Sequence, residues 1–138
     1  MTKSIWINLP VKDVQKAKAF FAALGFTYHA QQSQEGERAC FFIGTQKVVL
    51  MLFKTKQFEQ FVGQAAADTS KGSEVLFSID AESRAEVDEL ARKAAEAGGT
   101  VFAKPGDNQG WMYGCGFADV DGHRWNVLYM DMSKMPGK

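Results

Sequence analysis

The same order of predicted elements occurs twice along this chain: a strand, a helix and then three more strands. In the first half, the alternating run Ile5–Val11 predicts a strand, and the spacing of apolar residues predicts a helix from Val14 to Leu24. Asp13 is the predicted N-cap of this helix, and Gly25 directly follows its end. Three further strands are predicted at Phe26–Ala30, Arg38–Ile43 and Lys47–Phe53.

The second half repeats this order after a polar connector, Thr55–Ala67, which we interpret as a short helix. Its strand is predicted at Glu74–Ile79, and Ser83 with Glu86 forms a predicted capping box for a helix that ends near Ala97. Three more strands are predicted at Thr100–Lys104, Trp111–Phe117 and Arg124–Met130. Residues that we match between the halves lie at slowly increasing separations: Trp6 with Glu74, Gly25 with Gly98, and Cys40 with Cys115.

A duplicated βαβββ module is the simplest account of this pattern. The 138 residues suit one compact domain, residues 1–138, because single hydrophobic cores usually span roughly 100–200 residues. We therefore predict an α+β fold of two modules, about 1–54 and 73–132, joined by the helical connector. No stretch of the sequence has the composition of a flexible linker.

The balance of charges and the cysteine content exclude several classes of protein. The 16 basic residues are matched by 16 acidic residues, whereas a nucleic-acid-binding protein needs a clustered basic excess. No apolar run approaches the ~20 residues of a membrane span, and the first residues lack a signal-peptide pattern. Cys40 and Cys115 stand alone in the sequence, which favours a reducing compartment over a disulfide scaffold. We expect a cytoplasmic protein without nucleic-acid or membrane partners.

Two runs of the sequence carry a resemblance to a known superfamily. The first run is Ile7-x-Leu9-x-Val11-x-Asp13 leading into Phe20-Phe21-x-x-Leu24-Gly25-Phe26. The second run is Tyr113-Gly114-x-x-Phe117-x-Asp119-x-Asp121-Gly122-His123-x-Trp125. Both resemble the vicinal oxygen chelate superfamily of glyoxalase I, bleomycin-resistance proteins and extradiol dioxygenases. The chain is most similar to small members described as lactoylglutathione-lyase-like or bleomycin-resistance-like. This resemblance implies a cup formed by the sheets of the two modules, within a homodimer.

The resemblance also implies four metal-ligand positions, one each on the first, fourth, fifth and last strands, where the usual ligands are histidine, glutamine and glutamate. In this sequence the four positions fall on Trp6, Val49 or Met51, Glu74 and Asn126. Only Glu74 is a strong ligand for a divalent metal, and catalytic sites usually supply three protein ligands. We therefore expect no catalytic metal and no other cofactor, with a divalent metal as the alternative.

A cup without a metal can still bind a small molecule. Alternation along the strands predicts that its floor is lined by Trp6, Asn8, Met51, Phe53, Leu76, Ser78, Asn126 and Leu128. Apolar side chains with a few polar groups are typical of a ligand pocket. The alternative is a filled core between two sheets, which would bury Asn8, Ser78, Glu74 and Asn126 without partners at a high cost in free energy.

Three further side chains are candidates for the site. Glu74 can act as a general base or as a charge that recognises a cationic ligand, or it can be an ordinary exposed carboxylate. Trp111 and Tyr113 can stack on an aromatic ligand at the wall of the cup, or they can serve ordinary sheet packing. Cys40 and Cys115 are expected to be small buried hydrophobic residues.

These expectations lead to one preferred function and two alternatives. The preferred function is a metal-independent protein that binds an unidentified small molecule in its cup. The first alternative is a metal-dependent enzyme of the superfamily, such as a lactoylglutathione lyase or a dioxygenase. The second alternative is a metal-free lyase or isomerase that uses Glu74 as its base.

Overall fold

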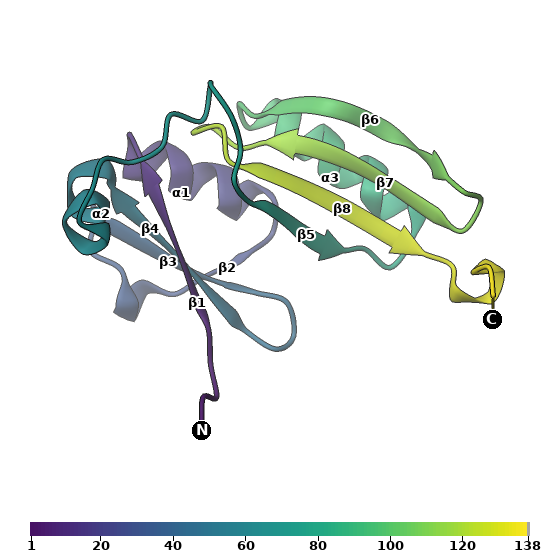
Figure 1. Cartoon of the computed structure of the whole chain (residues 1–138), viewed down its shortest axis with the longest axis horizontal. Coiled ribbons are helices and arrows are strands. Elements are labelled where there is room, and N and C mark those ends of the chain that lie inside the picture. Colours follow the sequence, from purple (N-terminus) through teal and green to yellow (C-terminus); the bar gives the residue numbers. More distant parts are fainter. Residues whose placement is uncertain (138) are drawn as a thin grey trace. The chain divides into compact units, whose positions relative to one another are not determined.

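The chain divides into two compact units, Met1–Asp68 and Thr69–Lys138, and each unit has its own four-stranded sheet. The computed structural model describes residues 1–137. Both units contain a strand, a helix and three strands in that order (Figure 1), which confirms the predicted α+β fold of two βαβββ modules.

The first unit builds its sheet in the order β1-β4-β3-β2, with β1 parallel to β4 and the other pairs antiparallel. Its elements are β1 (Trp6–Val11), α1 (Val14–Ala23), β2 (Thr27–Tyr28), β3 (Arg38–Ile43), β4 (Val48–Lys54) and α2 (Thr55–Val62). The Asp13 carboxylate caps α1 as predicted, accepting hydrogen bonds from the backbone N–H groups of Gln15 and Lys16 at 3.0 and 3.2 Å.

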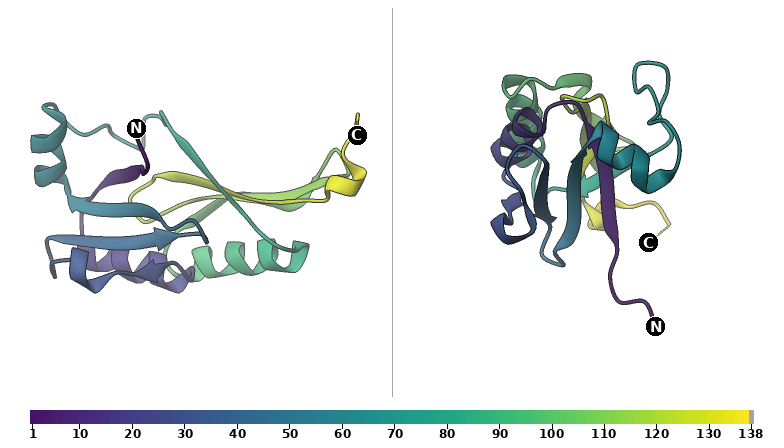
Figure 2. Two further views of the ribbon diagram at one scale, coloured as in Figure 1. Left: turned by 90° about the horizontal axis from the view of Figure 1, so that it is seen from below. Right: turned by 90° about the vertical axis from the view of Figure 1, so that its left-hand side faces the viewer.

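Helix α1 packs against one face of the first sheet (Figure 2), and the core of this unit lies between them. The side chains buried there come from alternate strand residues and from one stripe of the helix: Leu9, Val11, Val14, Ala17, Phe20, Phe21, Phe41, Leu50 and Leu52. Alternation along β1 places Trp6 and Asn8 on the other face, which α1 does not cover. We call the side of each sheet that faces away from α1 or α3 its open face.

Two predicted elements of the first unit are shorter than expected. Strand β2 has only two residues, because the chain turns into a 3₁₀ helix, Ala30–Gln32. Ser33 follows this helix, and its Oγ donates to the His29 carbonyl and accepts from the Cys40 N–H. Helix α2 ends at Val62, since Gly63 takes a left-handed conformation with φ +75° and caps it.

The second unit has the strand order β5-β8-β7-β6, with β5 parallel to β8 and the other pairs antiparallel. Its elements are β5 (Leu76–Asp80), α3 (Arg84–Glu96), β6 (Thr100–Asn108), β7 (Met112–Ala118), β8 (Arg124–Met130) and a short 3₁₀ helix (Met132–Lys134). Helix α3 lies along one face of this sheet (Figure 2), over buried Phe117, Trp125 and Val127. Ser83 caps α3 by accepting from the Glu86 N–H at 3.1 Å.

The strand boundaries of the second unit differ from the prediction at two places. Strand β5 begins at Leu76, so Glu74 precedes the sheet and does not belong to it. Strand β6 continues past Pro105 to Asn108, with irregular register between Val101 and Gly106. Proline is tolerated there because β6 is an edge strand, whose missing N–H need not serve the ladder.

The strand registers also bear on our matching of the two modules. Trp6 pairs with Val49 in the first sheet, whereas Glu74 precedes Leu76, the first paired residue of β5, which pairs with Arg124. The predicted equivalence of the two cysteines is wrong. Cys40 pairs with Met51, on the open face, whereas the Cys115 thiol is directed at the Val87 carbonyl of α3.

Candidate ligand-binding site

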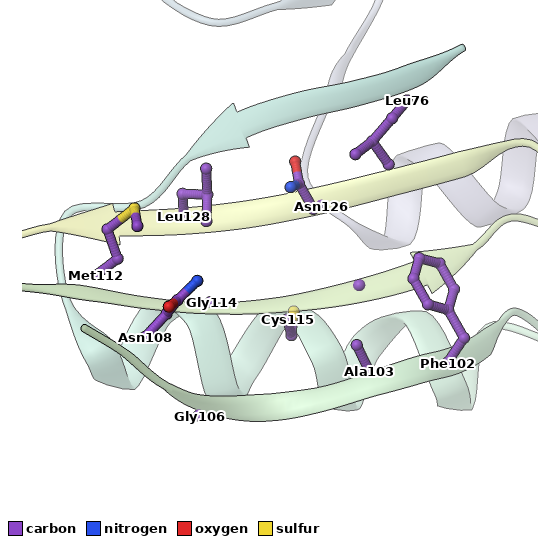
Figure 3. Close-up of a pocket in the computed structure, with 11 residues that line it drawn as sticks. Leu76, Phe102, Ala103, Gly106, Asn108, Met112, Gly114, Cys115, Asn126 and Leu128 are labelled. Carbon is purple, nitrogen blue, oxygen red and sulfur yellow. The ribbon is translucent and has the colours of Figure 1, made fainter. Parts of the chain in front are cut away.

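A pocket of about 220 Å³ lies on the open face of the second sheet and is formed within the second unit alone (Figure 3). Strands β5 to β8 all contribute to it. The residues that line it are Leu76, Phe102, Ala103, Gly106, Asn108, Met112, Gly114, Cys115, Gly116, Asn126 and Leu128. None of these residues carries a charge, and two of them, Asn108 and Asn126, have amide side chains.

Three glycines leave the floor of the pocket without side chains. Gly106 of β6 pairs with Gly114 of β7, and Gly116 lies two residues further along β7 on the same face. A side chain at Gly114 would meet the neighbouring strand, because a Cβ there would lie 2.6 Å from the Val127 carbonyl oxygen. The Phe102 ring lies over Gly116 and Leu128 lies against Gly114, whereas a Cβ at Gly106 would have no neighbour closer than 3.9 Å, so the bare part of the floor is at Gly106.

Phe102 forms one end of the pocket (Figure 3), and its ring covers Gly116. The guanidinium carbon of Arg124 lies 4.4 Å from the centre of this ring, a cation–π contact. This contact holds the ring although the residue is 46 % exposed.

Asn126 is the central polar group of the pocket. It is paired with Gly116 on one side and with Ser78 on the other, so its side chain projects from the middle of the open face. Its Oδ1 atom is buried and accepts no hydrogen bond. An unsatisfied buried acceptor costs free energy, and a ligand that donates a hydrogen bond removes this cost.

The predicted lining residues fall on the open faces of the two sheets. In the second sheet, Asn126 lines the pocket together with Leu76 and Leu128, and Ser78 is exposed beside Asn126. In the first sheet, the register places Asn8 beside Met51 and Trp6 beside Val49, and Phe53 beside Pro10. Trp6 is 60 % exposed. A role for these residues in binding stays a prediction.

Tyr113 lies on the opposite face of the second sheet from Asn126, which corrects its predicted place in the wall of the site. Its hydroxyl donates a hydrogen bond to Asp88 of α3 at 2.6 Å, and the Arg84 guanidinium lies over its ring. Tyr113, Cys115 and Phe117 are alternate residues of β7 and therefore share one face of the strand, the face that is turned towards α3. Trp111 comes just before β7 and is half-buried, with no hydrogen-bond partner for its Nε1 atom.

Glu74 lies in a bend two residues before β5 and is exposed. Its place outside the sheet differs from the predicted one, at the start of the strand. A catalytic role for Glu74 stays a prediction.

The residues at the superfamily's four metal positions do not fit a metal. The four positions that the resemblance gives hold Trp6, Val49 or Met51, Glu74 and Asn126. Only the Glu74 carboxylate is a strong ligand for a divalent ion, and it lies outside the sheet, two residues before β5. Within residues 1–137, no group of three or more histidine, cysteine, aspartate or glutamate side chains is placed to hold a metal ion.

The Asp119-x-Asp121-Gly122-His123 run builds the turn that leads into β8. The buried Asp119 carboxylate accepts hydrogen bonds from the N–H groups of Asp121 and His123 at 2.9 and 3.0 Å, and from Trp125 Nε1 at 3.1 Å. Burial raises the pKa of this carboxyl, against the opposing effects of His123 and these donors. Thr69 Oγ1 donates to the Asp121 carbonyl at 2.6 Å. The motif therefore has a structural role, since it holds the hairpin that positions Asn126.

Sequence reasoning missed most of β6 and β7 as parts of the site: Phe102, Gly106, Asn108, Met112, Gly114 and Gly116. The predicted sixth strand stopped at Lys104, before Pro105, so the residues beyond it were not placed on the sheet. One signal was present, because Gly114-Cys115-Gly116 puts two glycines on one face of a strand, where glycine marks a close approach or a bare surface.

The structure resembles several solved proteins over nearly the whole chain. A hypothetical protein from S. aureus is 34% identical, with 94% of each chain covered and a TM-score of 0.81. A glyoxalase-related enzyme from Fulvimarina pelagi is 19% identical, with 94% of this chain and 88% of that chain covered and a TM-score of 0.78. Lactoylglutathione lyase from Agrobacterium tumefaciens is also 19% identical, with 94% of each chain covered and a TM-score of 0.68. At such identities the last two show a shared fold alone.

A comparison with curated proteins found no match. A comparison with family models, in contrast, matched residues 3–127 to the Glyoxalase/Bleomycin resistance protein/Dioxygenase superfamily. This match runs through both βαβββ modules and agrees with the fold. The chain therefore belongs to the Glyoxalase/Bleomycin resistance protein/Dioxygenase superfamily.

Proposed function

We propose that this protein binds a small organic molecule in the pocket on the open face of its second sheet, and that it does so without a catalytic metal. The observation that carries this proposal is the buried Asn126 Oδ1 atom, which has no partner and lies in a pocket lined by neutral residues. The hollow of about 220 Å³ beside this acceptor gives a small molecule room to bind.

A thermal-shift screen of the full chain against a library of small organic compounds tests binding. A ligand at a hundred times its dissociation constant stabilises the folded protein by about 2.7 kcal/mol, which is readily measured as a rise in Tm. Each hit is then titrated into ¹⁵N-labelled protein, and the expected result is chemical-shift changes in β6, β7 and β8. If no hit shifts the amide resonances of these strands, the pocket is not the binding site.

Metal content tests the second half of the proposal. Protein purified without chelator is expected to contain zinc, nickel, iron and manganese well below one equivalent, because the four superfamily positions supply only one strong ligand, Glu74, where catalytic sites usually supply three. A stoichiometric amount of any of these metals, lost on dialysis against a chelator together with thermal stability, would show that the protein holds a metal. It would then favour a metal-dependent lyase or dioxygenase.

Two further features belong to the proposal. We expect a homodimer, as the resemblance implies, and the exposed apolar side chains of Trp6 and Leu76, 60 % and 54 % exposed, are suited to a contact surface. Light scattering after gel filtration measures the mass directly, and a monomer would refute this part.

We also place the protein in the cytoplasm, where its two free buried thiols stay reduced. In the described residues, no helix is both long and apolar enough to cross a membrane.

A further inference from the structure

We infer that the pocket takes uncharged, flat ring compounds that carry an N–H or O–H donor, and that Asn126 Oδ1 accepts this hydrogen bond. The inference rests on the proposed function, because it names the class of ligand for the same pocket. Three separate properties of the pocket carry it: its lack of charge, its bare floor and its single unsatisfied acceptor.

The lack of charge excludes ionised groups from the buried part of the ligand. All the lining residues are neutral. Arg124 is not a lining residue, and its guanidinium lies over the Phe102 ring. An ion moved from water into such a pocket loses its hydration without gaining a counter-charge. A neutral ligand avoids this loss.

The bare floor favours a flat ligand. Of the three floor glycines, Gly116 is buried under the Phe102 ring and Gly114 lies against Leu128, so the uncovered backbone is at Gly106, where a planar ring can lie. Phe102 and Met112 stand at the two ends of the pocket, as Figure 3 shows. An aromatic ring and a flexible thioether are both well suited to contact the edge of a flat ring.

The unsatisfied acceptor selects for a donor. Asn126 Oδ1 is buried without a partner in the protein, so a compound without a donor leaves it unpaired. A compound with an N–H or O–H group in reach pairs it. Sites built around a buried polar group reject analogues that lack the matching group much more strongly than analogues that lack a methylene.

Four probes of related shape test these properties without knowledge of the natural ligand. Indole carries an N–H donor, and benzofuran has nearly the same shape but no donor. Tryptamine adds a positive charge to indole, and indole-3-acetate adds a negative charge. Each probe is titrated into the full ¹⁵N-labelled chain. The expected result is that indole binds about tenfold more tightly than benzofuran, and that both charged probes bind more weakly than indole.

Two variants test where the probes bind, and a third variant serves as a control. Asn126→Leu removes the acceptor at similar volume, and indole and benzofuran should then bind with equal affinity. Gly106→Ala adds a methyl group to the floor, where its nearest neighbour is the Lys104 carbonyl at 3.9 Å, so it should weaken indole severalfold without strain. Gly72→Ala is the matched control, because a Cβ at Gly72 contacts nothing and Gly72 is not a lining residue.

Each result supports or overturns a stated part. Equal affinities for indole and benzofuran in the natural protein would overturn the claim that the ligand needs a hydrogen-bond donor. Tighter binding of either charged probe than of indole would overturn the claim that the pocket favours neutral ligands. Unchanged indole binding in Gly106→Ala would move the site elsewhere. If none of the four probes shifts an amide of β6, β7 or β8 while another compound from the screen does, this inference fails and the proposed function stands. If no compound does so, both fail.

Discussion

The ring of Phe102 lies so close to Gly116 that a Cβ on this glycine would be 2.6 Å from the ring atom Cε1. The two residues come from neighbouring strands, β6 and β7, and both line the pocket. The absence of a side chain at Gly116 therefore decides where Phe102 lies, and with it the end of the pocket. Different glycines of the floor have different neighbours, which leads to a graded prediction.

We predict that alanine at the three floor glycines destabilises the protein in the order Gly114, Gly116, Gly106. At Gly114 the new methyl group meets the Val127 carbonyl oxygen at 2.6 Å, and this backbone cannot move aside. Overpacking of this kind costs about 1–3 kcal/mol. At Gly116 the obstacle is the half-exposed Phe102 ring, which can rotate away at a smaller cost.

Urea denaturation of the three variants measures this order. Gly106→Ala should be as stable as the natural protein or slightly more stable, because its Cβ has room and the unfolded chain loses freedom. The Gly72→Ala variant controls for this effect on the unfolded chain. A Gly114→Ala protein as stable as Gly106→Ala would contradict the packing of β7 against β8.

The N-terminus of α1 depends on the Asp13 side chain. Its Oδ1 atom accepts from two backbone N–H groups, those of Gln15 and Lys16. Asp13→Ala leaves both donors without a partner in the protein and should lower the free energy of unfolding by about 1 kcal/mol. Asp13→Asn keeps an acceptor oxygen and should retain most of the stability. Equal losses in the two variants would show that the carboxylate charge, and not the cap geometry, matters.

The two thiols should be unreactive in the folded protein. Cys40 and Cys115 are 0% and 5% exposed, and burial raises the pKa of each thiol, so the reactive thiolate is suppressed at neutral pH. A thiol-specific colorimetric reagent should label both rapidly in urea and neither rapidly without it. Rapid labelling of one thiol in the native protein would show local opening around it.

The same pKa shifts set a direction for stability against pH. A thiol whose pKa is higher in the folded state than in the unfolded state stabilises the fold fully below its ordinary pKa. This contribution is lost as the pH rises through the raised value. We therefore expect the urea midpoint to fall as the pH becomes alkaline. The slope of the midpoint against pH should be smaller in Cys40→Ala than in the natural protein.

The hydrogen bond from Tyr113 to Asp88 should be visible in a titration of the three tyrosines. This bond is the main cause that raises the pKa of Tyr113, because the neutral phenol can donate and the phenolate cannot. Asp88→Asn removes the charged acceptor and should lower the pKa of one tyrosine, measured by absorbance between neutral and strongly alkaline pH. Tyr113→Phe identifies that tyrosine by its disappearance. An unchanged titration in Asp88→Asn would mean that the bond does not form in solution.

The sequence alone predicts the modules well because the signals that define them are local. The Asp13 cap, the glycines Gly25 and Gly98 after α1 and α3, and the alternation along β8 all act within a few residues, and each was found where it was expected. Asn126, which we predicted as a lining residue, does line the pocket. Its strand was placed correctly, and alternation along a strand sets the face on which each residue lies.

The remaining parts of the site depend on pairing between strands, which a single sequence does not show. Strand β6 crosses Pro105 because it lies at a sheet edge, and only the ladder to β7 reveals this. The same ladder brings Gly106 beside Gly114 and sets Phe102 over Gly116. A shift of one residue in register moves every side chain of a strand to the other face, so local pattern determined the modules and tertiary pairing decided the pocket.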